Sequence, residues 1–175
     1  MSAQDEMKLV DPVFRLALIT HVEVGPWQIV GAMGKGVRRI LPMLGGTFHI
    51  PKQKGGTFET PEVEGTVVSG ADWQILHSES LATLDARITL LTSDGHYIFL
   101  RAEGRRYASP EVLKRLVAGE TVQRADYYGV SSTVIETSAP GLEWMNHHLF
   151  IGNARTEKST HHVRYFVVDY PRDLA

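Results

Sequence analysis

Two segments near the middle of the sequence place ionisable side chains inside stretches that alternate like β-strands. Residues 70–73 contribute Asp72, and residues 84–87 contribute Asp85 and Arg87. Side chains alternate between the two faces of a strand, so Asp85 and Arg87 share one face. If that face points inward, an acid and an arginine line a cavity, where such groups must be paired or must serve a ligand. If it points outward, the two side chains form an exposed ion pair of little energetic value.

Three carboxyl groups are candidates for acid–base chemistry in such an interior. We expect the proton donor or acceptor among Asp72, Asp85 and Glu136, because carboxyl groups that share one lumen take different pKa values. Arg87 or Arg39 would stabilise the negative charge of an enolate or a carboxylate. Glu136 lies in an otherwise uncharged segment, so it is either an inward acid or an ordinary exposed residue.

Aromatic and amide side chains supply candidate ligand contacts. Trp144, Asn146 and His148 alternate on one face of a predicted strand, which suits recognition of an oxygenated ring. In the alternative interpretation, Trp144 belongs to the core and Asn146 bonds the backbone at a strand end. Tyr127 and Tyr128 point to opposite sides, so one of them could offer its hydroxyl inside. The predicted substrate-binding residues are Arg39, Trp73, Tyr128, Trp144, Asn146 and His148.

The residue types that hold metals and cofactors are absent or unsuitably spaced. The sequence has no cysteine, and none of its eight histidines belongs to an HExxH-like motif. The adjacent histidines at 147–148 and at 161–162 face opposite ways on a strand, and the second pair follows a polar turn, so we expect it to be solvated. No Ser or Thr follows Lys35 in the glycine cluster at 31–36, which favours a flexible loop over a phosphate loop. We therefore predict no metal and no cofactor.

Short segments of alternating apolar and polar residues predict a protein made mainly of strands. The expected strands are residues 13–23, 65–76, 82–92, 97–103, 127–137, 143–152 and 162–170, with turns at 25–26, 93–95 and 139–141. One helix is expected, capped by Ser109, begun by Pro110 and ended by Gly119. We predict a single domain over residues 1–175, with 1–8 as a flexible tail. Its fold would be all-β, mainly antiparallel: a closed or nearly closed β-barrel, lipocalin-like in outline, with one short α-helix.

Composition narrows the class of partner. The charge is nearly balanced, with 18 Lys and Arg against 20 Asp and Glu, and the basic residues are scattered. Nucleic acid is therefore an unsuitable partner. No apolar run approaches the roughly 18 residues that cross a bilayer, and the polar, acidic start is unlike a secretion signal. We expect a cytoplasmic protein that binds a small-molecule ligand and no membrane, with a homodimer as an open alternative.

A series of short motifs occurs in a recognisable order. They are Arg38-Arg39-Ile40-Leu41-Pro42, Gly45-Gly46-Thr47-Phe48, Gly65, Gly70-Ala71-Asp72-Trp73, Leu84-Asp85-Ala86-Arg87, Asp94-Gly95, Gly104, Tyr127-Tyr128, Glu136-Thr137, Trp144-Met145-Asn146 and Phe150-Ile151-Gly152. With them, from about Leu9 to Tyr170, the sequence resembles the domain-of-unknown-function family 3237, also called uncharacterised protein family 0311. The resemblance implies a compact β-barrel and supplies no reaction.

Two features depart from the family pattern. The segment between the Gly-Gly-Thr-Phe motif at 45–48 and Gly65 is longer, by about the length of a second Gly-Gly-Thr-Phe at 55–58. We expect this loop to form a different lid or rim. After Tyr128 the chain has Gly129 and Val130, where the family usually has bulky or basic residues. A substrate contact that the family supplies at these positions is therefore not expected in this chain.

These observations predict a cofactor-independent acid–base enzyme of the lyase, isomerase or cyclase type, acting on a small aromatic or oxygenated metabolite. A non-catalytic ligand-binding or carrier barrel is the alternative, and a structural subunit would instead fill its barrel with apolar side chains. The direction in which the charged face of residues 82–92 points decides among them.

Overall fold

The computed structural model describes residues 11–54, 58–118, 120, 122–157 and 159–170. In these ranges the strands are β1 (Val13–Val24), β2 (Gln28–Met33), β3 (Gly36–Ile50), β4 (Val63–Leu76), β5 (Leu81–Thr92), β6 (Tyr97–Ala108), β7 (Tyr127–Thr137), β8 (Phe150–Glu157) and β9 (Thr160–Asp169). One α-helix, α1 (Pro110–Val117), and two 3₁₀-helices, η1 (Arg124–Asp126) and η2 (Glu143–His147), connect them. The predicted all-β, mainly antiparallel barrel with one short helix is confirmed.

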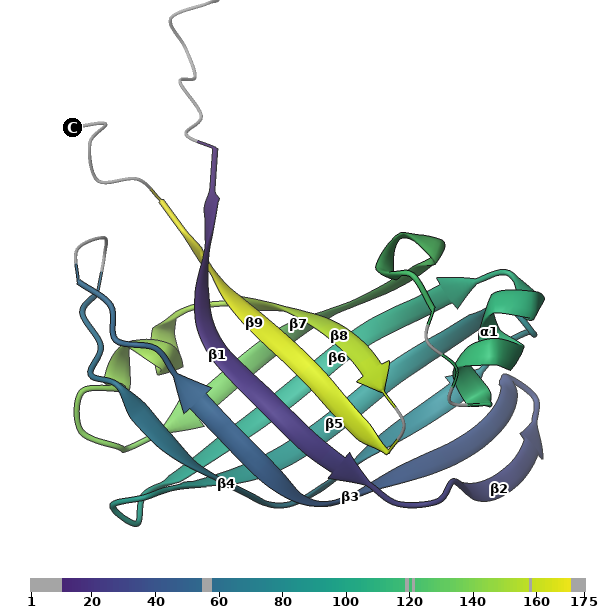
Figure 1. Ribbon diagram of the computed structural model, residues 1–175, viewed down its shortest axis with the longest axis horizontal. Coiled ribbons are helices and arrows are strands. Elements are labelled where there is room, and N and C mark those ends of the chain that lie inside the picture. Colours follow the sequence, from purple (N-terminus) through teal and green to yellow (C-terminus); the bar gives the residue numbers. More distant parts are fainter. Residues whose placement is uncertain (1–10, 55–57, 119, 121, 158, 171–175) are drawn as a thin grey trace, which may run out of the picture.

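The sheet closes because β1 pairs with β3 as well as with β9. The order around the barrel is β1-β9-β8-β7-β6-β5-β4-β3, and β2 adds a further strand along the first part of β3 (Figure 1). Closure gives the ring strands a hydrogen-bonded neighbour on both sides, which removes the exposed edges that an open sheet would present.

Gly46 permits a close approach of two strands where the barrel closes. It lies opposite Val22 in the β1–β3 ladder with a φ of +129°, and a Cβ added there would lie 2.0 Å from the carbonyl oxygen of His21. Glycine adopts this conformation without strain and leaves that space empty. The first Gly-Gly-Thr-Phe motif therefore lies inside a strand and serves barrel closure.

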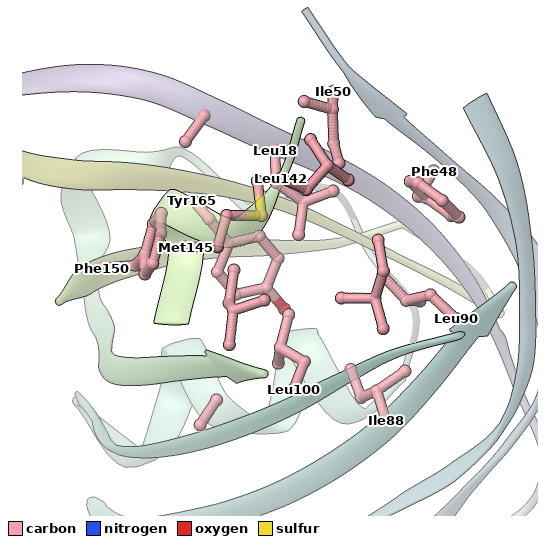
Figure 2. Packing of buried hydrophobic residues seen from close by; sticks show 14 of the residues in the cluster. Leu18, Phe48, Ile50, Ile88, Leu90, Leu100, Leu142, Met145, Phe150 and Tyr165 are labelled. Atoms are coloured by element: carbon pink, nitrogen blue, oxygen red, sulfur yellow. The ribbon is translucent and has the colours of Figure 1, made fainter. Parts of the chain in front are cut away.

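One half of the barrel interior is filled with apolar side chains. They include Leu18, Phe48, Ile50, Ile88, Leu90, Leu100, Leu142, Met145, Phe150 and Tyr165 (Figure 2). At this end the ring of Phe58 stacks on that of Trp144, with centroids 3.6 Å apart and planes 5° from parallel. The end of the barrel next to η2 is therefore packed, and space for a ligand must lie toward the other end.

The predicted helix forms at the opposite end of the barrel, on the side of β2 (Figure 1). The Ser109 hydroxyl accepts a hydrogen bond from the backbone N–H of Val112 at 3.3 Å, and Pro110 occupies the first helical position. Leu113 packs with the ring of Tyr127 in a second, smaller apolar cluster. The predicted end of the helix at Gly119 and the predicted tail at 1–8 lie outside the described residues.

Two local predictions were wrong. The glycine cluster at 31–36 is not a flexible loop: it holds the end of β2, a tight turn and the start of β3, because pairing of these two strands overrides the local glycine signal. Residues 143–152 are not one strand: η2 occupies the first half, and β8 begins only at Phe150. Here the turn at Gly141, with a φ of +79°, leads into a 3₁₀ turn that buries Met145. Gly55 to Thr57 of the second Gly-Gly-Thr-Phe lie outside the described residues.

Candidate functional site

A cavity of about 410 Å³ occupies the half of the barrel next to α1. Most of its wall is apolar, and Trp27 lines it together with Leu113 and Leu116 of α1. The polar side chains that line it are Asp72, Gln74, Arg106, Tyr127, Ser131, Thr156, Ser159, His161 and Tyr165. A largely apolar pocket with a few converging polar groups is the usual form of a small-molecule site.

The amide of Gln74 joins one carboxyl group to two guanidinium groups. Its Nε2 donates to Oδ2 of Asp72 at 2.6 Å. Its Oε1 accepts from Arg39 at 3.2 Å (Nε) and 2.8 Å (the guanidinium NH2 nitrogen), and from Arg106 at 3.4 Å. Asp72 and Gln74 are both almost fully buried, and they share the inward face of β4. The three charged groups thus belong to one hydrogen-bonded network.

Asp72 also holds the neighbouring strand. Its Oδ1 accepts a hydrogen bond from the backbone N–H of Asp85 at 3.0 Å, across the β4–β5 pair. Burial raises the pKa of the Asp72 carboxyl, while the bonds from Gln74 and Asp85 and the nearby guanidinium groups oppose the rise. The result is a carboxyl group that binds a proton more readily than a solvated aspartate.

The two guanidinium groups are placed differently. Arg39 is 6% exposed, and its guanidinium carbon lies 3.7 Å from the centroid of the Trp27 ring, a cation–π arrangement. Burial, with the charge of Arg106 second, lowers the pKa of Arg39 to about 10. Arg106 faces the cavity itself, and burial lowers its pKa as well. A pKa of about 10 keeps Arg39 a cation at neutral pH, and Arg106 is a cation as well because guanidinium groups keep their proton in proteins.

His161 and Tyr165 reach the same cavity from β9. Burial, reinforced by the charges of Arg106 and His162, lowers the pKa of His161 to about 4, so its imidazole is neutral at pH 7. Burial raises the pKa of Tyr165 above its usual value, so the phenol keeps its proton. The prediction that His161 is solvated was wrong, because strand alternation turns it inward together with Val163 and Tyr165.

The predicted inward direction of Asp85 and Arg87 was wrong. Their alternating neighbours Leu84, Ala86 and Ile88 line the cavity. Asp85 and Arg87 form an ion pair of 3.1 Å on the outer face, where their side chains are 37% and 43% exposed. Trp73 also lies outward, with the Arg87 guanidinium 5.4 Å from its ring. The exposed ion pair, which was the alternative interpretation, is what forms.

The remaining predicted residues are likewise spread away from the cavity. Glu136 is exposed on β7, and Tyr128 is 54% exposed, whereas its neighbour Tyr127 lines the cavity and donates its hydroxyl to the carbonyl of Ala154 at 3.2 Å. Asn146 binds the backbone N–H and C=O of Thr137 at 2.9 and 2.8 Å. The strand-end role of Asn146, left open by the sequence, is the one observed.

Trp144 and His148 belong to the packed end of the barrel. The Nδ1 of His148 lies 2.7 Å from the carbonyl oxygen of Trp144, and its ring meets those of Trp144 and Phe58 edge-on. Phe58 comes from the longer segment that was expected to form a lid or rim. Of the predicted site residues, the structure thus brings together Asp72, which lines the cavity, and Arg39, which is joined to Asp72 through Gln74.

Gln74, Arg106, His161 and Tyr165 were missed as site residues. A signal for Gln74 was present: it stands two positions after Asp72 and so shares its face of the strand. Arg106 had no such signal, because the sequence gives no reason to choose it over the adjacent Arg105.

Among the described residues, no group of three or more His, Asp or Glu side chains is arranged to hold a metal ion. No helix in the same ranges is long and apolar enough to cross a membrane.

Because Arg87 lies on the outer face, replacing it should have only a small effect on stability. We expect Arg87→Met to change the free energy of unfolding by less than about 1 kcal/mol, because an exposed ion pair is screened by water. Urea denaturation of the two proteins at pH 7 measures the difference. A loss of several kcal/mol would mean that Arg87 is buried in solution and would contradict its outward placement.

The comparisons with known proteins agree with the sequence motifs. The family model described as "Protein of unknown function (DUF3237)" matches residues 10–169. This chain belongs to the DUF3237 family. A UPF0311 protein from Rhodopseudomonas palustris (strain TIE-1) is 34% identical over 137 residues, which are 75% of this chain and 80% of that protein. The predicted family membership is confirmed.

Two solved structures show how the DUF3237 chain compares in three dimensions. A conserved protein of unknown function from Rhodopseudomonas palustris superposes with a TM-score of 0.78 at 28% identity, over 91% of this chain and 99% of that one. A structure described as an enzyme from Penicillium herquei superposes with a TM-score of 0.63 at 16% identity, over 93% and 98% of the two chains. At that identity the second likeness concerns the barrel fold alone.

Proposed function

We propose that the protein binds a small oxygenated or aromatic molecule in the cavity and acts on it as a cofactor-independent acid–base enzyme of the lyase, isomerase or cyclase type. Asp72 is the general base. The observation that carries the proposal is that Asp72 of β4 and His161 of β9 line the same cavity, where burial raises the pKa of Asp72 and lowers that of His161. Titratable groups whose environments separate their pKa values mark the acid and base roles in many active sites.

The carboxylate of Asp72 has room to accept a proton. It uses one acceptor position on Oδ1 for Asp85 and one on Oδ2 for Gln74, and a carboxylate offers about four. Its raised pKa makes it a stronger base than a solvated aspartate, which suits abstraction of a proton next to a carbonyl group.

The negative charge that then develops on the substrate oxygen meets favourable partners. The neutral imidazole of His161 can donate a hydrogen bond to an enolate oxygen, and it stays neutral when it does so. Arg106 on the cavity wall, and Arg39 through its bond to Gln74, supply positive charge next to the cavity. The apolar remainder of the wall and the ring of Trp27 suit the carbon skeleton of an aromatic or alicyclic substrate.

Turnover by matched variants tests this function. Wild type, Asp72→Asn and Asp85→Asn are each incubated with fractionated metabolite extracts, and compounds that change are identified by mass spectrometry. Asp72→Asn should lower kcat/KM for any such compound by about 10²- to 10⁴-fold, the usual contribution of a general base. Asp85→Asn, an exposed aspartate on the adjacent strand, should act like wild type. Full turnover by Asp72→Asn would contradict the proposal.

A carrier without catalysis is the second candidate, and one observation favours it. Both oxygens of Asp72 already bind the protein, so the carboxyl group has a structural role that needs no reaction. In that case a compound would be retained by wild type and by Asp72→Asn without chemical change. Recovery of an unaltered ligand from both proteins, with no product in any fraction, would decide for the carrier.

A further inference from the structure

The charges around the cavity do not balance. Arg39 and Arg106 supply two cations to the Gln74 network, and Asp72 supplies one anion. His161, which lines the same cavity, is neutral at pH 7. Among the described residues that line the cavity or bind Gln74, positive charge is therefore in excess. Charge in an interior is costly to leave uncompensated, so the imbalance favours a negatively charged occupant.

Arg106 is the cation with unused donors. Its hydrogen bond to Oε1 of Gln74 is long, at 3.4 Å, and its Nε has no hydrogen-bond partner among the residues that the structure describes. Arg39, by contrast, makes two shorter bonds to the same oxygen and covers the ring of Trp27. Because Gln74 already accepts from both arginines, it cannot satisfy Arg106 further. The Nε is itself buried, but a guanidinium group carries five N–H donors and the Arg106 side chain lines the cavity, so its terminal nitrogens can still bind a planar acceptor.

We propose that the occupant of this cavity is an organic carboxylate and that Arg106 binds its carboxylate group. The inference rests on the proposed function, since it names the class of ligand for the same site. The fixed fork of a guanidinium group matches the two oxygens of a carboxylate, and the resulting charge-assisted pair is stronger than a bond between neutral groups. Bound in this way, the ligand supplies one negative charge and cancels the excess, while its apolar part lies against Ile88, Met43 and the ring of Trp27.

A pair of matched probes tests the ligand class. 2-Naphthoate and 2-naphthamide have the same size and differ in charge, and both are small against a cavity of about 410 Å³. By isothermal titration calorimetry we expect wild type to bind the naphthoate at least about tenfold more tightly, since a hydrogen bond to a charged group is stronger than one between neutral groups. Intermolecular NOEs from the naphthyl ring to the methyl groups of Ile88 and Leu113 verify that the probe lies in the cavity.

Three variants assign the effect to one side chain. Arg106→Gln should lower naphthoate affinity at least about tenfold and leave naphthamide affinity nearly unchanged. Arg106→Lys should fall between wild type and Arg106→Gln, because lysine keeps the charge without the fork. Arg105→Gln, the outward neighbour on β6, should bind both probes like wild type.

The outcomes separate the two proposals. Equal affinity of wild type for the two probes would overturn the carboxylate inference, whatever the variants do, and would leave the proposed function intact. The same holds if Arg106→Gln binds naphthoate as tightly as wild type. If neither probe enters the cavity, the small-molecule site fails and both proposals fall together.

Discussion

Replacing Asp72 with leucine should lower the free energy of unfolding by about 3–5 kcal/mol, although it removes a polar group from the interior. The reason is the pair of cations that Asp72 balances. Arg39 is 6% exposed, and Arg106 faces the cavity through the same Gln74 bridge. Without the carboxylate, both guanidinium groups lose the nearest negative charge. The hydrogen bond that Asp72 accepts from the backbone N–H of Asp85 is lost as well.

A double variant isolates the charge effect. Adding Arg106→Met to Asp72→Leu should restore part of the lost stability, because it removes one of the two uncompensated cations. Urea denaturation at pH 7 gives the free energies for wild type, the two single variants and the double variant. Asp85→Leu is the control, since that side chain is exposed on the neighbouring strand, and it should cost less than about 1 kcal/mol. If Asp72→Leu is as stable as wild type, Asp72 does not balance the buried cations.

Acid should remove about 3 kcal/mol of the free energy of unfolding through His161 alone. Its pKa falls from 6.5 in the unfolded chain to about 4 in the folded protein, because of burial and then the charges of Arg106 and His162. Between these two values the unfolded chain binds a proton that the folded protein does not. Stability from this group is therefore complete above pH 6.5 and is lost as the pH falls toward 4. One pKa unit corresponds to about 1.4 kcal/mol, which yields the figure above.

His161→Gln removes this dependence. The free energy of unfolding of wild type should fall by about 3 kcal/mol more than that of His161→Gln when both are compared at pH 7 and pH 4. Asp72 titrates in both proteins, so its contribution largely cancels in the difference. His77→Gln, at an exposed histidine, retains His161 and should follow wild type. Parallel pH profiles for wild type and His161→Gln would place His161 in solvent and would remove it from the proposed site.

Local patterns in the sequence determined most of the elements and the family. The period of two located β1, β4, β5, β7 and β9 within a few residues of their bounds, because a strand with one buried face must alternate. Ser109 and Pro110 located the start of α1 because capping chemistry is local to a few residues. The motifs from Arg38 to Gly152 identified the family, since so many of them occur in the family's order.

The tertiary structure alone decided which face of each strand lies inside. On β5 the sequence offered two faces of similar length, one with Asp85 and Arg87 and one with Leu84, Ala86 and Ile88. Closure of the ring and pairing with β4 and β6 turned the apolar face inward. The same closure brought Asp72 of β4, Arg106 of β6 and His161 of β9 to one cavity, although they are far apart in the sequence. The residue pattern of a strand indicates that its two faces differ. Which face points into the barrel depends on the register and curvature of all the neighbouring strands.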